Sequence, residues 1–222
     1  MKTEIIQYAC HQCGKIHEMP AIRIADETMK NEVLHTEIFQ TRCPSCNAEN
    51  AIYYPMAYIS RTDRYLIQLV NPSEESADPV SEFLEEFDPE EKEELLKNYE
   101  IRTVINSNQL AEKIMIFDQQ RDDHVIELCK VILKGSLMNQ YPGLKVKNLY
   151  YSFLAGQKEA QLSIETDDGF GQAVQLPEEL YEGILSDAIP KLPEKLRHTR
   201  EVDEDWAFAA MGYDPYAKPS QS

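Results

Sequence analysis

Two Cys-x-x-Cys pairs, Cys10/Cys13 and Cys43/Cys46, constrain this chain more than any other feature of its sequence. Zn²⁺ prefers four soft ligands at the corners of a tetrahedron, and two residues between cysteines let one tight turn present both sulfurs to the same ion. Two such turns complete the coordination shell. We therefore predict that Cys10, Cys13, Cys43 and Cys46 bind a single Zn²⁺ ion.

The residues beside the pairs support this interpretation. Gly14 and Asn47 directly follow the two pairs, and both residue types tolerate a left-handed backbone. A turn with positive φ would direct backbone N–H groups at the sulfurs. Four thiolates around Zn²⁺ carry a formal charge of about −2 and leave no open coordination position, so we expect a structural rather than a water-activating site. Lys15 and Arg42 flank the pairs and are expected to offset part of that charge.

The separation between the pairs is long. The 29 residues 14–42 lie between them, whereas about 15–20 are usual in four-cysteine zinc signatures. The excess must fold as ordered structure, and apolar runs and turn signals place elements in it. We expect strands over 4–9, 15–25 and 37–42, with a short helix over 26–34, and two further strands beyond the second pair, over 51–54 and 64–70. The predicted fold class is therefore α+β, beginning with a four-cysteine zinc ribbon that has inserted strands.

In the remainder of the chain, the spacing of apolar residues changes from a helical to a strand period. Apolar spacing and N-cap residues predict a helical middle, and alternation between turn signals predicts a C-terminal antiparallel β-meander followed by a helix. The expected helices cover 79–87, 89–99, 106–117, 122–134 (ending at Lys134-Gly135) and 178–189, and the meander covers 148–176. We expect a zinc-ribbon β region at 1–72, an acidic helical linker at 73–100, and a last part, 101–222, packed as one unit with 1–72.

Charge excludes some classes of partner. The chain has 22 Lys+Arg and 39 Asp+Glu, a net charge of −17, and residues 73–100 alone hold 12 acidic and 2 basic side chains. Such a surface repels phosphate backbones, so nucleic acid is an unlikely partner. The acidic run is expected to be a solvated helical face rather than a docking tail.

Membrane insertion and export are also not expected. The longest run without a charged residue, Asn50–Ser60, has eleven residues, and a membrane-spanning helix needs about 20. The start, Met1-Lys2-Thr3-Glu4, lacks the apolar stretch of a secretory signal. Five cysteines, an odd number, fit free thiols in a reducing compartment. We expect a cytoplasmic protein.

Three other functions stay open. Each CxxC could be a redox dithiol, although such motifs usually precede a helix and strand-like sequence follows both pairs here. An enzyme could use Asp122, Asp123, His124 and Glu127, or a cleft between the two halves, although a helix N-cap with first-turn acids explains the same residues. An RNA-binding regulator would need a basic patch gathered by folding from Lys2, Lys15, Arg23, Arg42, Arg61 and Arg64.

Several conspicuous side chains are expected to have ordinary roles. The histidines near the pairs lie close enough in the sequence to replace or join a cysteine ligand, but we expect them on the surface or in loops, because four thiols already suffice for zinc. The fifth cysteine should be a small core residue, the tyrosines of 53–58 should face a core rather than stack bases, and the lone tryptophan should dock on a core. These residues are His11, His17, His35, Cys129, Tyr53, Tyr54, Tyr58 and Trp206.

At these residues the sequence resembles the CpXC family, bacterial proteins with two Cys-Pro-x-Cys motifs. The second motif matches as Cys43-Pro44-Ser45-Cys46, whereas the first has His11 in place of the proline. The likeness runs from about residue 5 to 135 and includes Arg102-Thr103-Val104, Leu110-x-Glu112-Lys113-Ile114 and Asp122-Asp123-x-x-Ile126-Glu127-Leu128. The resemblance implies metal binding through the four cysteines and no established activity.

Together these observations predict a zinc-binding protein whose structural four-cysteine site supports a protein-interaction or scaffold module. Its partners would be proteins of unknown identity, self-association is possible, and the balance is against an enzyme. The alternatives are a metal- or carboxylate-dependent enzyme with a site between the two halves, and a thiol redox protein.

Overall fold

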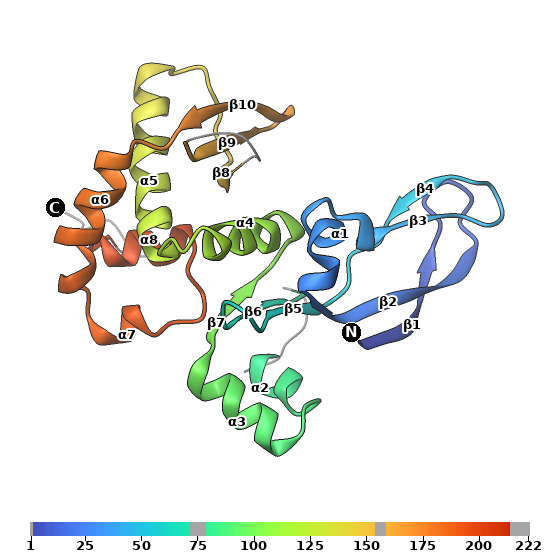
Figure 1. The fold of residues 1–222 in the computed structure, drawn as a ribbon. Coiled ribbons are helices and arrows are strands. Elements are labelled where there is room, and N and C mark those ends of the chain that lie inside the picture. The colour runs from blue at the N-terminus through green and yellow to red at the C-terminus, as the bar shows by residue number, and fades with distance from the viewer. Residues whose placement is uncertain (1, 72–78, 154–158, 214–222) are drawn as a thin grey trace, which may run out of the picture. The chain divides into compact units, whose positions relative to one another are not determined.

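The computed structural model describes residues 2–71, 79–153 and 159–213, which form a mixed α+β protein as expected (Figure 1). The chain divides into two compact units, Met1–Ile114 and Met115–Ser222, with the boundary inside helix α4 (Ser107–Asp118). Across the described residues, no helix combines the length and the apolar character needed to span a membrane. The division into 1–72, 73–100 and 101–222 stays a prediction, and residues 73–78 lie outside the described residues.

Unit 1 is built on a five-stranded sheet in the order β1-β2-β5-β6-β7. Its strands are β1 (Lys2–Ala9), β2 (Ile16–Asp26), β5 (Met56–Ser60), β6 (Tyr65–Leu69) and β7 (Glu100–Val104). The pairs β1–β2 and β5–β6 are antiparallel, whereas β2–β5 and β6–β7 are parallel. The sheet is therefore mixed, with β1 as one edge and β7 as the other.

The centre of this sheet is fully covered. Every residue of β5 and β6 is buried, as expected of strands with both faces packed. Two helices, α2 (Pro79–Leu84) and α3 (Pro89–Asn98), contribute to the core at the sheet. That core contains Ile24, Ala57, Ile59, Leu66, Val80, Phe83, Leu84, Leu95 and Ile101. The helical part of the acidic segment thus supplies apolar side chains to unit 1.

The expected helix start at Asp88 is confirmed. The Asp88 side chain accepts hydrogen bonds from the backbone N–H groups of Glu90 and Glu91, and Pro89 occupies the first helical position. The early acids also interact favourably with the helix dipole. This short segment is therefore helical for local reasons and is held in place by its apolar face.

The stretch between the two cysteine pairs folds as ordered structure, as expected. Asp26 caps the 3₁₀ helix η1 (Glu27–Met29), which continues into α1 (Lys30–Leu34). A second 3₁₀ turn, η2 (Glu37–Phe39), precedes β3 (Gln40–Arg42), and β3 pairs antiparallel with β4 (Glu49–Ala51). The strand expected over 37–42 is thus only its last three residues, because Ile38 and Phe39 are buried from the 3₁₀ turn.

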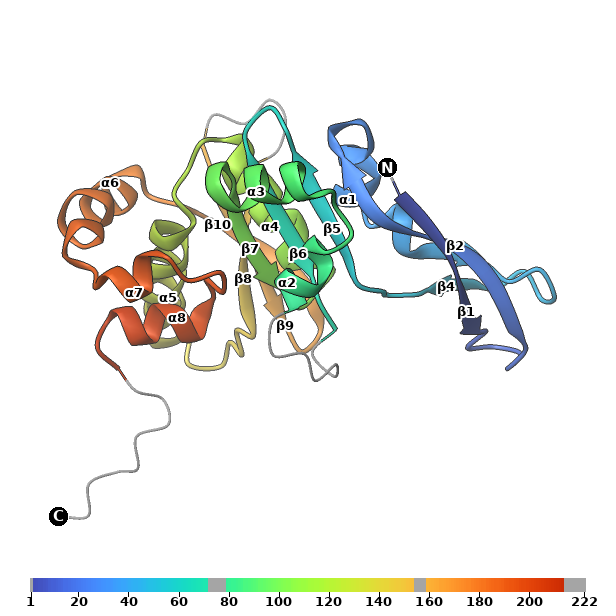
Figure 2. The ribbon, with the colours of Figure 1, turned by 90° about the horizontal axis from the view of Figure 1, so that it is seen from below.

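Pro20 shows why β2 can be long and still contain a proline. At Pro20 the strand pairs with Ile5 of β1 on one side, and its pairing with β5 begins only at Ile24. The missing N–H of Pro20 therefore disrupts no ladder between β2 and β5, as expected for a proline at a sheet edge. Figure 2 shows β1 and β2 running together as one long hairpin.

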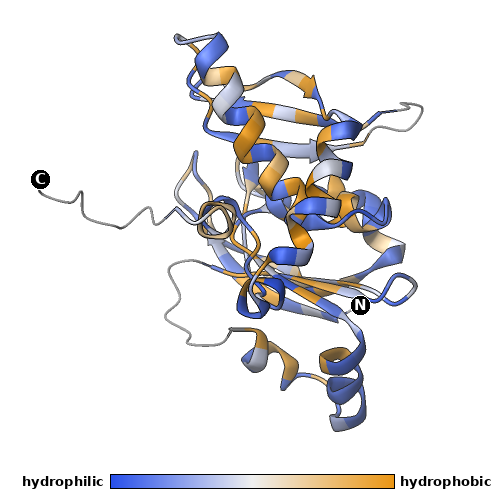
Figure 3. Ribbon diagram, turned by 90° about the vertical axis from the view of Figure 1, so that its left-hand side faces the viewer, coloured by the Kyte–Doolittle hydropathy of each residue, from blue (hydrophilic) through white to orange (hydrophobic). Residues whose placement is uncertain are grey.

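Unit 2 consists of a three-stranded antiparallel sheet and its helices. The sheet order is β10-β9-β8, and this confirms the expected meander with β8 (Asn148–Ser152), β9 (Gln161–Thr166) and β10 (Gly169–Gln175). The helical elements are α5 (Asp123–Gln140), α6 (Glu178–Asp187), η3 (Ile189–Lys191), α7 (Glu194–Arg197) and α8 (Glu204–Ala210). Hydrophobic and hydrophilic residues alternate along these elements (Figure 3), as is typical of elements with one buried face.

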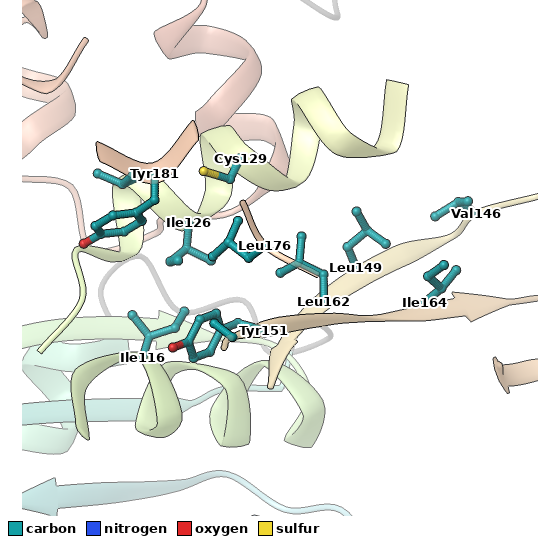
Figure 4. Packing of buried hydrophobic residues seen from close by; sticks show 12 residues of the cluster. Ile116, Ile126, Cys129, Val146, Leu149, Tyr151, Leu162, Ile164, Leu176 and Tyr181 are labelled. Atoms are coloured by element: carbon teal, nitrogen blue, oxygen red, sulfur yellow. The ribbon is translucent and has the colours of Figure 1, made fainter. Parts of the chain in front are cut away.

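The core of unit 2 joins α5, α6 and the meander. Figure 4 shows Ile126 and Cys129 of α5 beside Leu149, Leu162 and Tyr181. A second cluster contains Leu128, Leu192, Val202, Trp206 and Ala207 and attaches α8 to α5. Trp206 docks on a core and Cys129 is a fully buried core residue, as predicted.

The expected end of helix α5 was wrong. α5 continues through Lys134-Gly135 to Gln140, so Gly135 lies inside the helix and does not end it. The glycine costs the helix roughly 0.5–1 kcal/mol relative to alanine, and partly buried residues on both sides of it, Leu133 and Leu137, pack on the core of unit 2. The strand expected over 51–54 overlaps only the end of β4 at Ala51, so β5 was missed. The strand β7 was also missed, and its pairing partner β6 lies more than thirty residues earlier in the chain.

Candidate metal centre

The four cysteine sulfurs of the two pairs lie together in unit 1. Their Sγ atoms all fall within 4.8 Å of one another, and Cys10–Cys46 and Cys13–Cys43 are each 3.7 Å apart. Four sulfurs at about 2.3 Å from a tetrahedral Zn²⁺ would be separated by roughly 3.8 Å. All five cysteines of the chain are free thiols. The arrangement therefore fits a four-coordinate metal ion.

Two turns with the same backbone hydrogen-bond pattern present these sulfurs. In the first, Gly14 N donates to Cys10 O (2.9 Å), and in the second Asn47 N donates to Cys43 O (2.8 Å). Gly14 has φ +70° and Asn47 has φ +60°, so both adopt the left-handed conformation expected from their residue types. The turns join β1 to β2 and β3 to β4, and each holds one buried and one exposed cysteine.

The pKa values of the thiols depend on how close the four sulfurs lie to one another. Backbone N–H groups of Cys13 and Gln12, with the sulfurs of Cys43 and Cys46, outweigh desolvation and lower the pKa of Cys10 to about 6. At Cys46 a backbone N–H of Ala48 lowers the pKa, but desolvation and the three neighbouring sulfurs outweigh it and raise the pKa to about 12. The four neighbouring thiols share protons, so the first thiolate forms more readily than the last. A divalent metal would balance the charge of the thiolates.

Two polar contacts outside the quartet connect the two turns. His17 Nε2 of β2 lies 3.3 Å from the buried Cys43 Sγ. Asn50 of β4 is buried, and its Oδ1 accepts a hydrogen bond from His11 N at 3.0 Å. Sequence reasoning assigned no role to Asn50 and placed His17 on the surface or in a loop, whereas His17 is partly buried in a strand. The only sequence signal for His17 was its place four residues after Cys13.

The two cations that flank the pairs, Lys15 and Arg42, are both exposed. Arg42 forms an exposed ion pair with Glu49, with Nη2 2.7 Å from Oε1. Exposed pairs contribute little because water screens them. Hydrogen-bond donors directed at the sulfurs are therefore better placed than these cations to balance thiolate charge.

The Asp122 cluster is a second group of potential ligands, in unit 2. Ligand atoms of Asp122, Asp123 and His124 lie within 4.8 Å of one another. Asp122 Oδ1 accepts hydrogen bonds from the N–H of His124 (2.9 Å) and lies 3.0 Å from its Nδ1, as in a helix N-cap. Glu127 is not part of this group, and its Oε1 is paired with Lys130 Nζ at 3.0 Å. Capping of α5 accounts for these contacts, so they give no support to an enzyme site.

Most of the remaining residues considered for a functional role have a structural role instead, as expected. Tyr54 and Tyr58 are buried, whereas Tyr53 is 63% exposed and its ring centroid lies 5.3 Å from that of the buried Phe39. Burial raises the pKa of Cys129 to about 12, so this thiol is unreactive at neutral pH. His35 is exposed, and its Nδ1 lies 2.8 Å from Asn31 O.

Most of the basic residues considered for an RNA surface are paired with glutamates. These pairs are Lys2–Glu86 (2.7 Å), Arg23–Glu86 (3.5 Å), Arg42–Glu49 (2.7 Å) and Arg61–Glu91 (2.9 Å). Paired cations have less excess positive charge to offer a phosphate backbone. The pairing thus works against a basic patch in unit 1.

Comparison with known proteins identifies a family. A family model described as CpXC protein matches residues 6–130, which include all four clustered cysteines. Neither the curated proteins nor the solved structures contain a match to the chain.

Proposed function

The chain belongs to the CpXC protein family, and from that premise and the cysteine cluster we propose that it is a zinc-binding protein whose metal is structural. Cys10, Cys13, Cys43 and Cys46 would be the four ligands. The site would hold two hairpins together and so support a protein-interaction module. This role agrees with what the sequence alone predicts.

The observation that carries the proposal is the spacing of the four sulfurs. Two pairs at 3.7 Å match the edges of a zinc–thiolate tetrahedron, and the two turns approach from separate hairpins. With four thiolates bound, Zn²⁺ has no position for water or substrate. Strands rather than helices follow both pairs, which favours this function over a redox dithiol of the thioredoxin type.

The exposed side of the β1–β2 hairpin supports the interaction role. β1 is an edge strand, and Ile5 (66% exposed) and Ile16 (69% exposed) are large apolar residues open to solvent on it and on β2. An unpaired strand edge can accept a strand from another chain. The pairing of arginines with glutamates and the net charge of −17 favour a protein partner over nucleic acid.

Native mass spectrometry of the intact chain tests the metal. We expect one zinc ion per chain in the wild type and none retained by Cys43→Ser. Cys129→Ala is the matched control, because it removes a cysteine of unit 2 that lies outside the quartet. A metal-free chain containing two disulfides would replace the structural-zinc proposal with the redox one.

The interaction role needs its own measurement. We expect partners cross-linked to the zinc-loaded chain to be lost both on chelation and in the Ile5→Lys/Ile16→Lys variant. The doubly substituted chain should still bind zinc, since neither isoleucine is a ligand. Partners that remain on the substituted chain would show that another surface is used.

A further inference from the structure

We propose that His17 is a positioning residue of the four-cysteine site, whose Nε2–H donates a hydrogen bond to the Cys43 thiolate and strengthens retention of the metal. The inference rests on the proposed function, because it concerns the same site. The two atoms lie 3.3 Å apart, within the range for a hydrogen bond to sulfur. A thiolate can only accept, so Nε2 carries the proton when metal is bound.

Neighbouring residues hold the His17 ring in this orientation. His17 lies directly opposite Tyr8 in the β1–β2 ladder, and the centroids of the two rings are 5.9 Å apart. Tyr8 is itself buried, with 6% of its surface exposed. The imidazole is therefore placed by a strand pair and a packed ring, which limits its freedom before the metal arrives.

Cys43 is the buried sulfur that has a side-chain donor beside it. Cys43 is 1% exposed, whereas Cys13 and Cys46 are exposed and can receive hydrogen bonds from water. The buried Cys10 is served by backbone N–H groups. Among the described residues, His17 is the one side chain outside the quartet that hydrogen-bonds a sulfur of the site.

The geometry favours a donor role over coordination by His17. The set of ligand atoms that all lie within 4.8 Å of one another contains the four sulfurs and does not include His17. His17 also comes from the first hairpin and Cys43 from the second. The hydrogen bond therefore brings two ligand-bearing turns together as well as removing charge from one thiolate. Partners of this kind typically change metal affinity 10–100-fold.

The test compares zinc affinity in three variants by competition with a chromophoric chelator. We expect His17→Ala to weaken zinc binding about 10–100-fold and His17→Gln to restore most of the affinity, because its amide N–H can also reach the sulfur. His35→Ala is the matched control, because His35 is exposed and bonds only to the backbone of its own helix. Circular dichroism of the zinc-loaded chains verifies that each variant is folded.

Cobalt substitution gives a readout that a merely structural effect would not change. In Co²⁺-loaded His17→Ala the sulfur-to-metal charge-transfer band should move to longer wavelength, since the Cys43 sulfur becomes more electron-rich. The visible bands of tetrahedral Co²⁺ should stay. Unchanged zinc affinity with an unmoved charge-transfer band would refute the role of His17.

Two further outcomes separate the inference from the function beneath it. A wild-type chain that binds no metal would refute the proposed function itself. X-ray absorption showing three sulfurs and one nitrogen around zinc in the wild type would overturn the donor role, because His17 would then be a ligand. Zinc bound by four sulfurs in both wild type and His17→Ala, with the affinity difference above, supports the proposal.

Discussion

One buried polar side chain, that of Asn50, connects the two hairpins in addition to the sulfurs. Asn50 is 4% exposed; its Nδ2 donates to Ala48 O (2.9 Å) while its Oδ1 accepts from His11 N. The side chain therefore completes one turn and joins it to the other. Buried polar groups with satisfied hydrogen bonds of this kind specify a unique arrangement.

Replacing Asn50 tests this connection. We expect Asn50→Ala to lower the free energy of unfolding by about 1–2 kcal/mol, since it leaves Ala48 O and His11 N without this partner. Urea denaturation followed by circular dichroism measures the loss. Asn31→Ala, at an exposed position of α1, should be close to neutral. Equal stabilities of the two variants would show that Asn50 does not connect the hairpins.

Glu27 gives unit 1 a dependence on pH. Desolvation raises the pKa of Glu27, but hydrogen bonds from the backbone N–H groups of Thr62, Arg61 and Glu27 itself and from the Ser60 hydroxyl outweigh it and lower the pKa below its ordinary value. A carboxyl with a depressed folded-state pKa stabilises the fold above its unfolded pKa. That contribution is lost as the pH falls through the folded value.

We therefore expect Glu27→Gln to be less stable than the wild type at pH 7 by about 1 kcal/mol, because neutral acceptors bond more weakly. The difference should shrink as the pH falls below about 4.5. Thermal unfolding at a series of pH values measures it. Glu93→Gln, at an exposed position of α3, should show no such trend, and a constant difference for Glu27→Gln would contradict the assignment.

At the scale of elements, backbone conformation decides what the turns can hold. Gly14 ends the first cysteine turn at φ +70°, whereas Gly135 lies inside helix α5. A Cβ atom built at either glycine meets no atom within 4 Å. The two positions therefore differ in backbone strain and not in available space.

Alanine at these two glycines should have effects of opposite sign. Gly14→Ala should destabilise the chain by about 1–2 kcal/mol, because a Cβ disfavours the left-handed conformation. Gly135→Ala should stabilise it by up to about 1 kcal/mol, since alanine favours the helix. Thermal unfolding of the zinc-loaded variants compares them. Stabilisation by both would mean that Gly14 is not confined to positive φ.

At the scale of the whole molecule, each unit has a hydrophobic core of its own. The cores of unit 2 are built from residues between Ile116 and Ala207, and none of the four clustered cysteines belongs to them. Within unit 1, the core around β5, β6, α2 and α3 also contains none of these cysteines. The metal should therefore matter most to the two hairpins that bear the sulfurs.

Removal of zinc tests this division. After chelation we expect hydrogen exchange to accelerate over β1–β2 and β3–β4, where structural zinc can supply about 10–16 kcal/mol in isolated peptides. Residues of α5, β8 and β9 should keep their protection. Exchange measured by mass spectrometry resolves these segments. Uniform loss of protection along the chain would show that the metal stabilises both units together, and no change would show that the hairpins need no metal.

Interactions between residues close in the sequence determined many of the turns, helix starts and strands of this protein. The cysteine spacing, the turn residues Gly14 and Asn47 and the caps at Asp88 and Asp122 act through neighbours close in the chain, so pattern and residue type were sufficient to predict them. The alternation of the meander was equally local. The grouping of four cysteines and the mixed α+β class followed from these signals.

Only the tertiary structure decided which distant segments meet. β7 becomes a strand because β6 offers a parallel edge, and α5 continues past Gly135 because the side chains on either side of that glycine pack on the core of unit 2. His17 reaches Cys43 because two hairpins approach each other. Such contacts depend on packing between segments far apart in the chain, and the conformational propensities of neighbouring residues do not predict them.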